Sequence, residues 1–473
     1  MARGRRRGRS SPFVLGDVIP PATRLLTTAR MLVDRVFPRG ALVLSVLSLG
    51  YLGMGILRNR VFANTFGAGS ELDAYYAAFR LPEIALDVLV AAGLTAPFVP
   101  IYTSLRHDDE GSANRFARTV LTGAIGVMSV ASLALFLLAP WIGDRLEGFD
   151  APTRALYADL LRINCLAQIL FAASFAIGEV LVANRRFVAY ALAPILYTGG
   201  IVVGTVLFAD EFGIAATAWG AVGGAAAHLA VRFAGSLRTS FRIRPAFDVR
   251  SAAFREFLRL MVPRMVSHPI ELLMLTWFTV LATQLGPGSV TSFNFASDYQ
   301  VVPIQLIGVP FSLAIFPTLS AAFADGDRAT FRAILGRNLA VIAMLTTMAA
   351  AGLFVLSGLV VDVLLGGGRF EADDVTRTTA VVAAFALSIP FDALAYPLSR
   401  GLYATHDTIR QAASSFVALG VVIAVSSALV GPLGILAIPL GYAAGMAAKD
   451  VVLAFFLFRR LAFVGVGEVR TAG

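Results

Sequence analysis

The chain has 473 residues, of which 57% are hydrophobic and 15% charged, and its formal net charge is +9. Soluble domains carry about a quarter charged residues, so this composition excludes a soluble globular protein. Arginine and lysine collect in the cytoplasmic loops of membrane proteins, and the basic charge therefore indicates topology rather than nucleic-acid binding. The lone cysteine, Cys165, lies in an apolar run, which argues against a disulfide framework or a thiolate metal site. We expect no metal and no cofactor.

Residues 1–40 form a basic segment that we place in the cytoplasm. Arg3, Arg5 and Arg9 belong to a run that no apolar stretch follows directly, so we do not expect a signal peptide. Apolar residues recur at helical spacing between Ala22 and Val36, with arginines between them. This stretch is either a short helix lying on the anionic leaflet or an unstructured basic tail.

A membrane-spanning helix needs about 20 mostly apolar residues, and interior Gly or Pro is tolerated when neighbouring helices pack around it. The sequence predicts an all-α polytopic membrane protein with about twelve such helices. They are expected at 41–63, 72–103, 119–143, 157–183, 188–208, 214–235, 257–284, 289–323, 337–364, 377–404, 411–430 and 433–457.

The charges of the connecting loops predict the orientation. Past the second helix, alternate connections are basic, for example around Arg185 and around Arg242, whereas the others are short, acidic or mixed. This alternation predicts an even number of helices with both termini in the cytoplasm. We divide the chain into an N-lobe at 41–235 (helices 1–6), a basic cytoplasmic linker at 236–256, a C-lobe at 257–457 (helices 7–12) and a cytoplasmic tail at 458–473.

A weak internal repeat relates the two halves. Phe98-Val99-Pro100 ends the second helix and Phe316-Pro317 ends the eighth, and an acidic patch follows each. Leu181-Val182-Ala183-Asn184 similarly resembles Leu402-Tyr403-Ala404-Thr405. Six helices separate the copies, so both have the same orientation in the membrane, an arrangement that places a transporter's substrate site between its lobes. Chance similarity between apolar segments is the alternative.

The second helix carries four ionisable residues, and such residues cost about 2.5–3.5 kcal/mol each inside a membrane unless they face a cavity or a partner. Asp73, Arg80 and Asp87 are spaced by seven, with Glu83 between the last two. Helical periodicity places them near one face, which we expect to line the space between the lobes. The alternative is a structural Arg80–Glu83 pair that ties helices together.

Arg58 and Arg60 interrupt the end of the first apolar run. They either present a fork to a phosphate or pyrophosphate or extend to the lipid headgroups, with the second reading favoured for Arg60. Candidates for gating or ion coupling are ionisable residues in other predicted helices. These are Asp87, Asp298, Asp392, His268 and Glu271.

Two of the remaining charged positions have a structural alternative. His268 can change its charge near neutral pH, which suits proton coupling, but a histidine packed between helices is the alternative. Lys449 and Asp450 are expected to form a local pair near the cytoplasm.

The sequence contains no Walker-type phosphate loop, no Ser/His/Asp motif and no metal-ligand spacing. We therefore expect a protein that is not an enzyme and has no ATP-driven engine of its own. Transport would depend on an ion gradient, the membrane potential or consumption of the product on the far side.

Several blocks of the chain carry motifs that belong together. The first runs from Leu57-Arg58-Asn59 through Phe66-Gly67-Ala68-Gly69 and Leu72-Asp73-Ala74-Tyr75-Tyr76-Ala77-Ala78-Phe79-Arg80-Leu81-Pro82 to Ala96-Pro97-Phe98-Val99-Pro100. Further matches are Ile315-Phe316-Pro317-Thr318-Leu319-Ser320 and Leu402-Tyr403-Ala404-Thr405-His406-Asp407-Thr408. Together these blocks resemble the MurJ/MviN lipid II flippases of the multidrug/oligosaccharidyl-lipid/polysaccharide exporter superfamily. The resemblance implies two six-helix lobes around a cationic cavity. It also implies alternating-access flipping of an undecaprenyl-pyrophosphate-linked peptidoglycan precursor from cytoplasm to periplasm.

The chain departs from the family pattern at charged positions. Members usually have Arg-Asp where this chain has Arg58-Asn59, and an arginine pair where it has Leu86-Asp87. A family arginine also aligns at or next to Asp298. The cavity therefore keeps Arg58 and Arg80 but gains acid, which makes it less positive toward a pyrophosphate.

Our leading hypothesis is a MurJ-like flippase for a polyprenyl-linked saccharide in the bacterial plasma membrane. The predicted substrate-binding residues are Arg58, Arg80, Glu83 and Asp73. The alternatives are a cation-coupled exporter of drugs or amphiphiles, and a non-transporting lipid-binding paralogue that recruits cell-wall enzymes. The expected partners are the lipid-linked substrate, membrane lipids and, as an open alternative, cell-wall synthesis enzymes, with a monomer as the expected state.

Overall fold

The computed structural model describes residues 39–267 and 270–463. The predictions for residues 1–38 and for His268 lie outside this part of the chain. The described residues are almost entirely helical, and the only extended pairing among them is an isolated bridge between Gly367 and Phe370. The predicted all-α fold is confirmed.

The first half of the chain forms the helices of the first six predicted spans. These are α2 (Arg39–Phe66), α3 (Ser70–Leu86), a π-helical turn (Asp87–Ala91), α4 (Ala92–Asp108), α5 (Glu110–Gly143), α6 (Ala151–Ala183), α7 (Phe187–Phe212) and α8 (Ile214–Ser236). The π turn joins α3 and α4 into one long segment, the second span.

The second half forms the other six. These are α9 (Ala252–Ser267), α10 (Ile270–Thr283), α11 (Ser289–Pro303), a π-helical turn (Ile304–Gly308), α12 (Val309–Ala324), α13 (Arg328–Leu365), α14 (Ala372–Ala386), α15 (Ile389–Ala404), α16 (Thr408–Leu433), a short 3₁₀ turn (Gly434–Leu436) and α17 (Ala437–Phe463). Each predicted span overlaps one of these helices or a consecutive group of them.

Eight described segments are long and apolar enough to cross a membrane by length and composition alone. The segments that fall short include α2 and α3–α4, which carry Arg58 and Arg80. A helix that faces a polar interior on one side does not need an apolar surface all round. Arg58 and Arg80 therefore lie on segments that are less apolar than an ordinary span, whereas Asp298 and Asp392 lie on segments that qualify.

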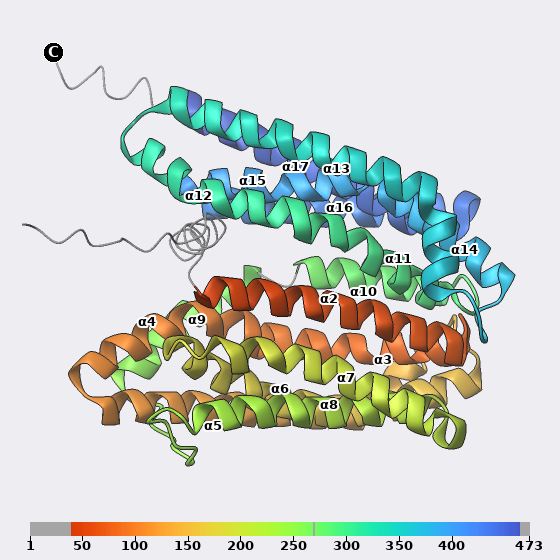
Figure 1. The fold of residues 1–473 in the computed structure, drawn as a ribbon, viewed down its shortest axis with the longest axis horizontal. Coiled ribbons are helices and arrows are strands. Elements are labelled where there is room, and N and C mark those ends of the chain that lie inside the picture. Colours follow the sequence, from red (N-terminus) through yellow and green to blue (C-terminus); the bar gives the residue numbers. More distant parts are fainter. Residues whose placement is uncertain (1–38, 268–269, 464–473) are drawn as a thin grey trace, which may run out of the picture.

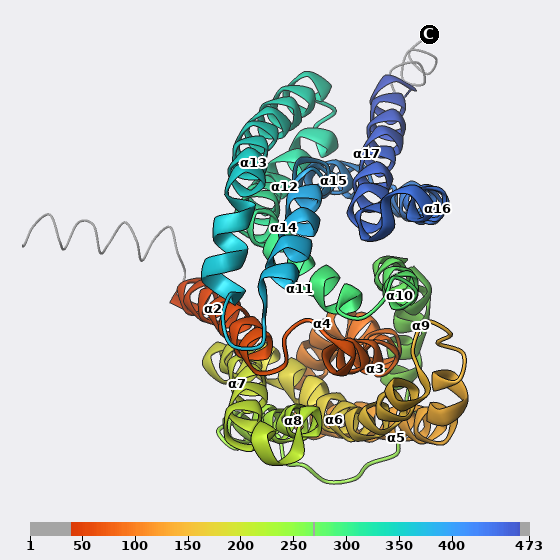
Figure 2. The same ribbon diagram turned by 90° about the vertical axis from the view of Figure 1, so that its right-hand side faces the viewer.

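The helices form two bundles that lie side by side, as Figure 2 shows. We call α2–α8 the N-lobe and α10–α17 the C-lobe. The start of α2 and the end of α17 lie at the same end of the molecule, on the left of Figure 1. α9 belongs spatially with the N-lobe, because Phe257 packs edge-on against Phe116 of α5 with 5.8 Å between ring centroids.

The internal repeat is visible in the backbone. A five-residue π turn interrupts the second span at Asp87–Ala91 and the eighth at Ile304–Gly308. Arg185, after α6, has φ 56°, and His406, at the matching place after α15, has φ 59°. Residues other than glycine seldom adopt this conformation, so its recurrence at both places supports the parallel repeat.

An aspartate also begins the helix that follows in each copy. Asp109 accepts hydrogen bonds from the backbone N–H groups of Gly111 and Ser112, and Asp327 accepts one from that of Thr330. Hydrogen bonds from Ser112 and Gly111 hold the pKa of the Asp109 carboxyl below its ordinary value, and those from Thr330 do the same for Asp327. The acidic patches noted in the sequence thus act as helix caps.

Candidate functional site

The two lobes are joined at one end by Asp73. This carboxylate is buried and accepts hydrogen bonds from the backbone N–H of Gly288 (2.6 Å), the backbone N–H of Thr291 (2.7 Å) and the Thr291 hydroxyl (2.6 Å). Gly288 and Thr291 lie at the start of α11, where backbone N–H groups have no partner within the helix. An N-lobe side chain therefore caps a C-lobe helix.

The same end carries a second contact between the loops that follow α2 and α13. The backbone N–H of Arg369 donates to the carbonyl of Asn64 (3.0 Å), and that of Ala68 donates to Asp374 (3.2 Å). Gly67 (φ 68°) would place an added Cβ 2.4 Å from the Arg369 carbonyl oxygen, so a larger residue does not fit there. The glycine turn noted in the sequence is what allows this approach.

Arg58 forms an ion pair across the lobes. One Nη lies 2.8 Å from Asp298 Oδ2, and the Arg58 guanidinium also donates to the side chain of its neighbour Asn59. Asn59 in turn donates to the same Asp298 oxygen at 2.8 Å. A phosphate that bound Arg58 would compete with this carboxylate.

Arg80 also reaches the other lobe. Its Nη2 donates to Asn294 of α11 at 3.0 Å, whereas Glu83, its predicted structural partner, lies at 4.0 Å. The Nε of Arg80 is buried and has no hydrogen-bond partner in the described structure. The side chain of Glu83 is 46% exposed, so the carboxylate of this pair is accessible from the cavity while Arg80 is largely buried.

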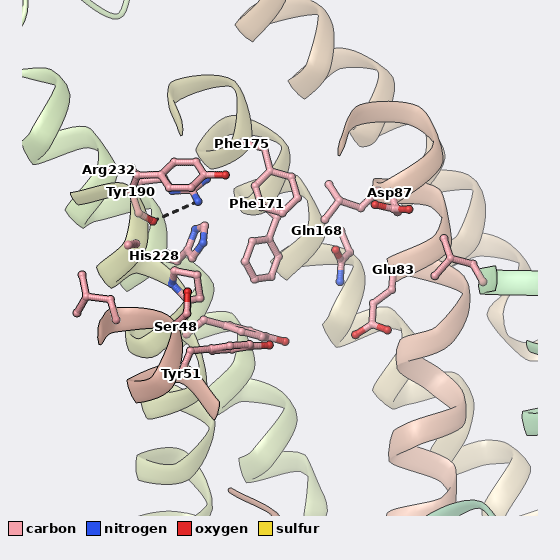
Figure 3. A pocket seen from close by; sticks show the side chains of 16 residues that line it. Ser48, Tyr51, Glu83, Asp87, Gln168, Phe171, Phe175, Tyr190, His228 and Arg232 are labelled. Atoms are coloured by element: carbon pink, nitrogen blue, oxygen red, sulfur yellow. Dashed lines mark hydrogen bonds between the residues drawn. The ribbon is translucent and has the colours of Figure 1, made fainter. Parts of the chain in front are cut away.

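The N-lobe encloses a cavity of about 570 Å³, shown in Figure 3. Glu83 and Asp87 lie on one side of it, and Arg232 and His228 of α8 lie across from them. Between them the wall is largely aromatic. Its rings are Tyr51, Phe171, Phe175, Tyr190 and Tyr197. Leu272 of α10 also lines the cavity, which therefore reaches the boundary between the lobes.

The C-lobe encloses a smaller cavity of about 260 Å³, lined by Glu271, Asp392 and Lys449 among others. Asp392 accepts hydrogen bonds from the Tyr442 hydroxyl (2.7 Å) and from Gln300 Nε2 (3.2 Å). Lys449 pairs with Glu271 at 3.4 Å, not with its neighbour Asp450 as the sequence suggested. Among the described residues, no group of three or more His, Cys, Asp or Glu side chains is arranged to hold a metal ion.

The predicted site residues therefore fall into separate places. Asp73 lies at the joined end, Arg58 and Asp298 pair with each other, Glu83 and Asp87 line the N-lobe cavity, and Asp392 and Glu271 line the C-lobe cavity. Sequence reasoning missed Asn294, His228 and Arg232. For Arg232 the signal was present, because an arginine within the predicted 214–235 span is an intramembrane charge.

Two helical lobes with a shared repeat, polar residues between them and a contact at one end define the class as a two-lobed membrane transporter. The sequence model of the family described as "Lipid II flippase MurJ" matches residues 62–472. The chain belongs to this family. A lipid II flippase MurJ of Burkholderia cenocepacia is 26% identical over 384 residues, which cover 78% of this chain and 73% of that protein. A probable lipid II flippase MurJ of Thermotoga maritima is 28% identical over 359 residues, covering 75% and 71%.

Solved structures agree with this assignment at the level of the fold. A lipid II flippase MurJ in an inward closed conformation matches with a TM-score of 0.75 at 22% identity, covering 89% of each chain. An inward-facing multidrug resistance MATE family transporter of the MOP superfamily matches with a TM-score of 0.71 at 12% identity, covering 88% of this chain and 96% of that one. The predicted family resemblance is confirmed, and the chain is a multi-pass membrane protein of a transporter family.

Proposed function

We propose that this protein is a flippase that moves a polyprenyl-pyrophosphate-linked saccharide, lipid II or a related cell-envelope precursor, from the cytoplasmic to the outer leaflet. Its family membership supports this proposal, as does the gathering of Arg58, Arg80 and Glu83 at the boundary between the lobes. The headgroup would pass between the lobes while the polyprenyl chain stays in lipid. The partners are thus the lipid-linked substrate and the surrounding lipids.

The orientation we propose has both termini in the cytoplasm of a bacterium. The basic connections around Arg185, Arg242 and Arg328 lie at the same end as the start of α2 and the end of α17, in keeping with the positive-inside rule. Asp73 and the 366–371 loop would then join the lobes on the outer side. The lobes would separate there when the substrate leaves.

The observation that carries the proposal is the position of Arg58 and Arg80. Both guanidinium groups lie between the lobes, and each donates a hydrogen bond to a C-lobe side chain, Asp298 for Arg58 and Asn294 for Arg80. A pyrophosphate that displaced these partners would gain two charge-assisted hydrogen-bonding groups. Once the lipid had left, Asp298 and Asn294 would pair with the two arginines again. The protein without substrate would thus be stable.

A lipid-flipping assay on the purified protein in vesicles tests the proposal. Fluorescent lipid II is reconstituted with the wild type, Arg58→Ala or Arg80→Ala, and its appearance in the opposite leaflet is followed. Losing a hydrogen bond to a charged group costs about 1.5–3 kcal/mol, so each variant should flip roughly 10- to 100-fold more slowly. Arg162→Ala is the control, since Arg162 pairs with exposed Asp159 instead of the other lobe. Wild-type vesicles no faster than empty ones would refute the proposal.

A second candidate is the cation-coupled export of drugs or amphiphiles. It is favoured by the acids Glu83, Asp87 and Asp298, of which Glu83 and Asp87 line the larger cavity. A lipophilic cation could bind with its apolar part against the aromatic rings and its charge near these carboxylates. Proton-dependent efflux of a cationic dye from cells that lack other pumps, lost in Glu83→Gln, would identify this function. Complementation of a flippase-depleted bacterium would instead identify the first.

A further inference from the structure

Arg232 is held deep inside the N-lobe, away from the lobe boundary. It is 3% exposed, and its Nη1 donates to the backbone carbonyl of Ser174 in α6 at 3.1 Å. The guanidinium lies over the ring of Tyr190, with its carbon 4.6 Å from the centroid, and 5.6 Å from that of Phe175. Placing an arginine side chain inside a membrane costs free energy, and such residues usually have a functional role.

Two of the three guanidinium nitrogens of Arg232 have backbone partners, since Nη2 also donates to the Tyr190 carbonyl at 3.5 Å (the dashed line in Figure 3), but the third has none among the described residues. Its Nε is buried and has no hydrogen-bond partner in the described structure, although a buried donor without a partner costs about 1–3 kcal/mol. The backbone makes room for it at Gly178, where an added Cβ would lie 2.6 Å from Arg232 Nη1. Glu179, the next residue, is buried and interacts electrostatically with the guanidinium, which keeps part of its charge balanced.

The cavity beside Arg232 has the form of a ligand site. At about 570 Å³ it lies within the range of small-molecule pockets. His228, one turn before Arg232 on α8, lies with its Nδ1 2.7 Å from the Ser174 hydroxyl. Glu83 and Asp87 are on the far side, so the site is cationic at one end and acidic at the other (Figure 3).

We propose that Arg232 is an anion-binding subsite that takes a phosphoryl group of the transported headgroup inside the N-lobe. The inference rests on the proposed flippase function and specifies where the headgroup is recognised. The aromatic wall provides flat apolar faces for a sugar ring, and the carboxylates of Glu83 and Asp87 accept hydrogen bonds from its hydroxyl or amino groups. In this chain, Leu86 and Asp87 stand where family members usually have an arginine pair. Arg232 supplies a positive charge in the same lobe.

The test is a binding measurement on the full-length protein in detergent, with geranylgeranyl pyrophosphate as the probe. Removing one charge-assisted contact should weaken binding of this probe at least about tenfold in Arg232→Gln. Arg162→Gln is the matched control, because it also removes an arginine from an N-lobe helix but leaves the cavity lining intact. If inorganic pyrophosphate competes with the probe, the free anion is sufficient for binding at this site. If it does not compete, the site requires the lipid-linked pyrophosphate.

A second variant keeps the proposal testable if Arg232→Gln does not fold. Ala191 lines the cavity, and Ala191→Phe should block access to it and weaken binding of the probe to a similar extent. Thermal unfolding of each variant shows whether it is folded. Binding of unchanged affinity in a folded Arg232→Gln protein, or in a folded Ala191→Phe protein, overturns the proposal.

The outcomes also separate this inference from the proposed function. If the wild type flips lipid II and Arg232→Gln flips it equally well with the same apparent affinity, the subsite is wrong and the flippase function stands. If the wild type binds the probe through Arg232 but does not flip lipid II, the subsite stands and the flippase function fails.

Discussion

The N-lobe and the C-lobe each enclose a cavity among their helices, and the two cavities differ in size and charge. The N-lobe cavity is about 570 Å³, with Arg232 and His228 facing two carboxylates across an aromatic wall. The C-lobe cavity is about 260 Å³, and its acids already have partners: Tyr442 and Gln300 for Asp392, and Lys449 for Glu271. The backbones follow one repeat, as the two π turns show. The two lobes therefore share a backbone repeat but differ in the size and charge of their cavities.

This contrast suggests that the N-lobe binds and the C-lobe couples. A larger cavity that carries charged groups of both signs can receive a polar headgroup, because the headgroup can pair with either sign. A small cavity whose acids are already hydrogen-bonded is better suited to gaining or losing an ion. The predictions below test this division and the equivalence of the two lobes.

The largest effect is expected at the ion pair that links the lobes. Arg58→Asp places a second carboxylate beside Asp298, and should lower flipping in vesicles by at least about tenfold, since two like charges then repel each other where the lobes meet. The double variant Arg58→Asp with Asp298→Arg restores the attraction with the signs exchanged. We expect it to recover folding and part of the transport. Equal inactivity of a folded double variant would mean that a cation is needed at position 58 itself, for the ligand.

A comparable loss should follow neutralisation of the C-lobe acid, but with a different signature. Asp392→Asn keeps an oxygen for the Tyr442 hydroxyl and Gln300, so the fold should hold. If the C-lobe couples an ion, transport should fall about tenfold and lose its response to an imposed proton or sodium gradient, while binding of geranylgeranyl pyrophosphate stays normal. Transport that keeps its full gradient response in Asp392→Asn would assign coupling to another residue.

The equivalent helix pairs of the two lobes, α7–α8 and α16–α17, should differ in their tolerance of added volume. An added Cβ at Gly224 of α8 would lie 2.3 Å from the backbone oxygen of Tyr197, whereas at Gly445 of α17 it would lie 2.4 Å from a side-chain methyl of Val422 and 3.0 Å from the nearest backbone atom, the oxygen of Ala418. Close contacts between small residues are typical of membrane helices, and backbone cannot yield as a side chain can. Gly224→Ala should therefore cost about 1–3 kcal/mol and Gly445→Ala clearly less.

Thermal unfolding in one detergent measures both glycine variants on the same scale. Gly223→Ala is a control on the same helix as Gly224, because an added Cβ there has no neighbour within 4 Å. A larger loss for Gly445→Ala than for Gly224→Ala would contradict the contrast between backbone and side-chain packing.

The sequence predicted the helices well because spans depend on long apolar runs and loops on charge. The internal repeat could also be predicted, from the Phe and Pro residues that end the second and eighth helices and from the similar segments before Arg185 and His406. The sequence could not predict which polar side chains pair with each other, because these pairings depend on how the two lobes pack together. Asp73 caps a helix that begins more than 200 residues later, and Arg80 prefers Asn294 to its neighbour Glu83. The position of Arg232 inside an apolar span marks it as an intramembrane charge, but its contacts with Ser174 and Tyr190 depend on how α6, α7 and α8 pack.

The smallest effect is expected at the matched helix caps. Asp109 accepts hydrogen bonds from two residues, the N–H of Gly111 and the N–H and hydroxyl of Ser112, while Asp327 accepts them chiefly from one, Thr330. Asp109→Ala should therefore lower the melting temperature slightly more than Asp327→Ala. Because the folded-state pKa of each carboxyl is lowered, its contribution is complete above the ordinary aspartate pKa and disappears as the pH falls through the lowered one. The difference between wild type and Asp109→Ala should thus be present at neutral pH and shrink in acid, and a difference that grows as the pH falls would contradict the assignment of Asp109 as an ionised cap.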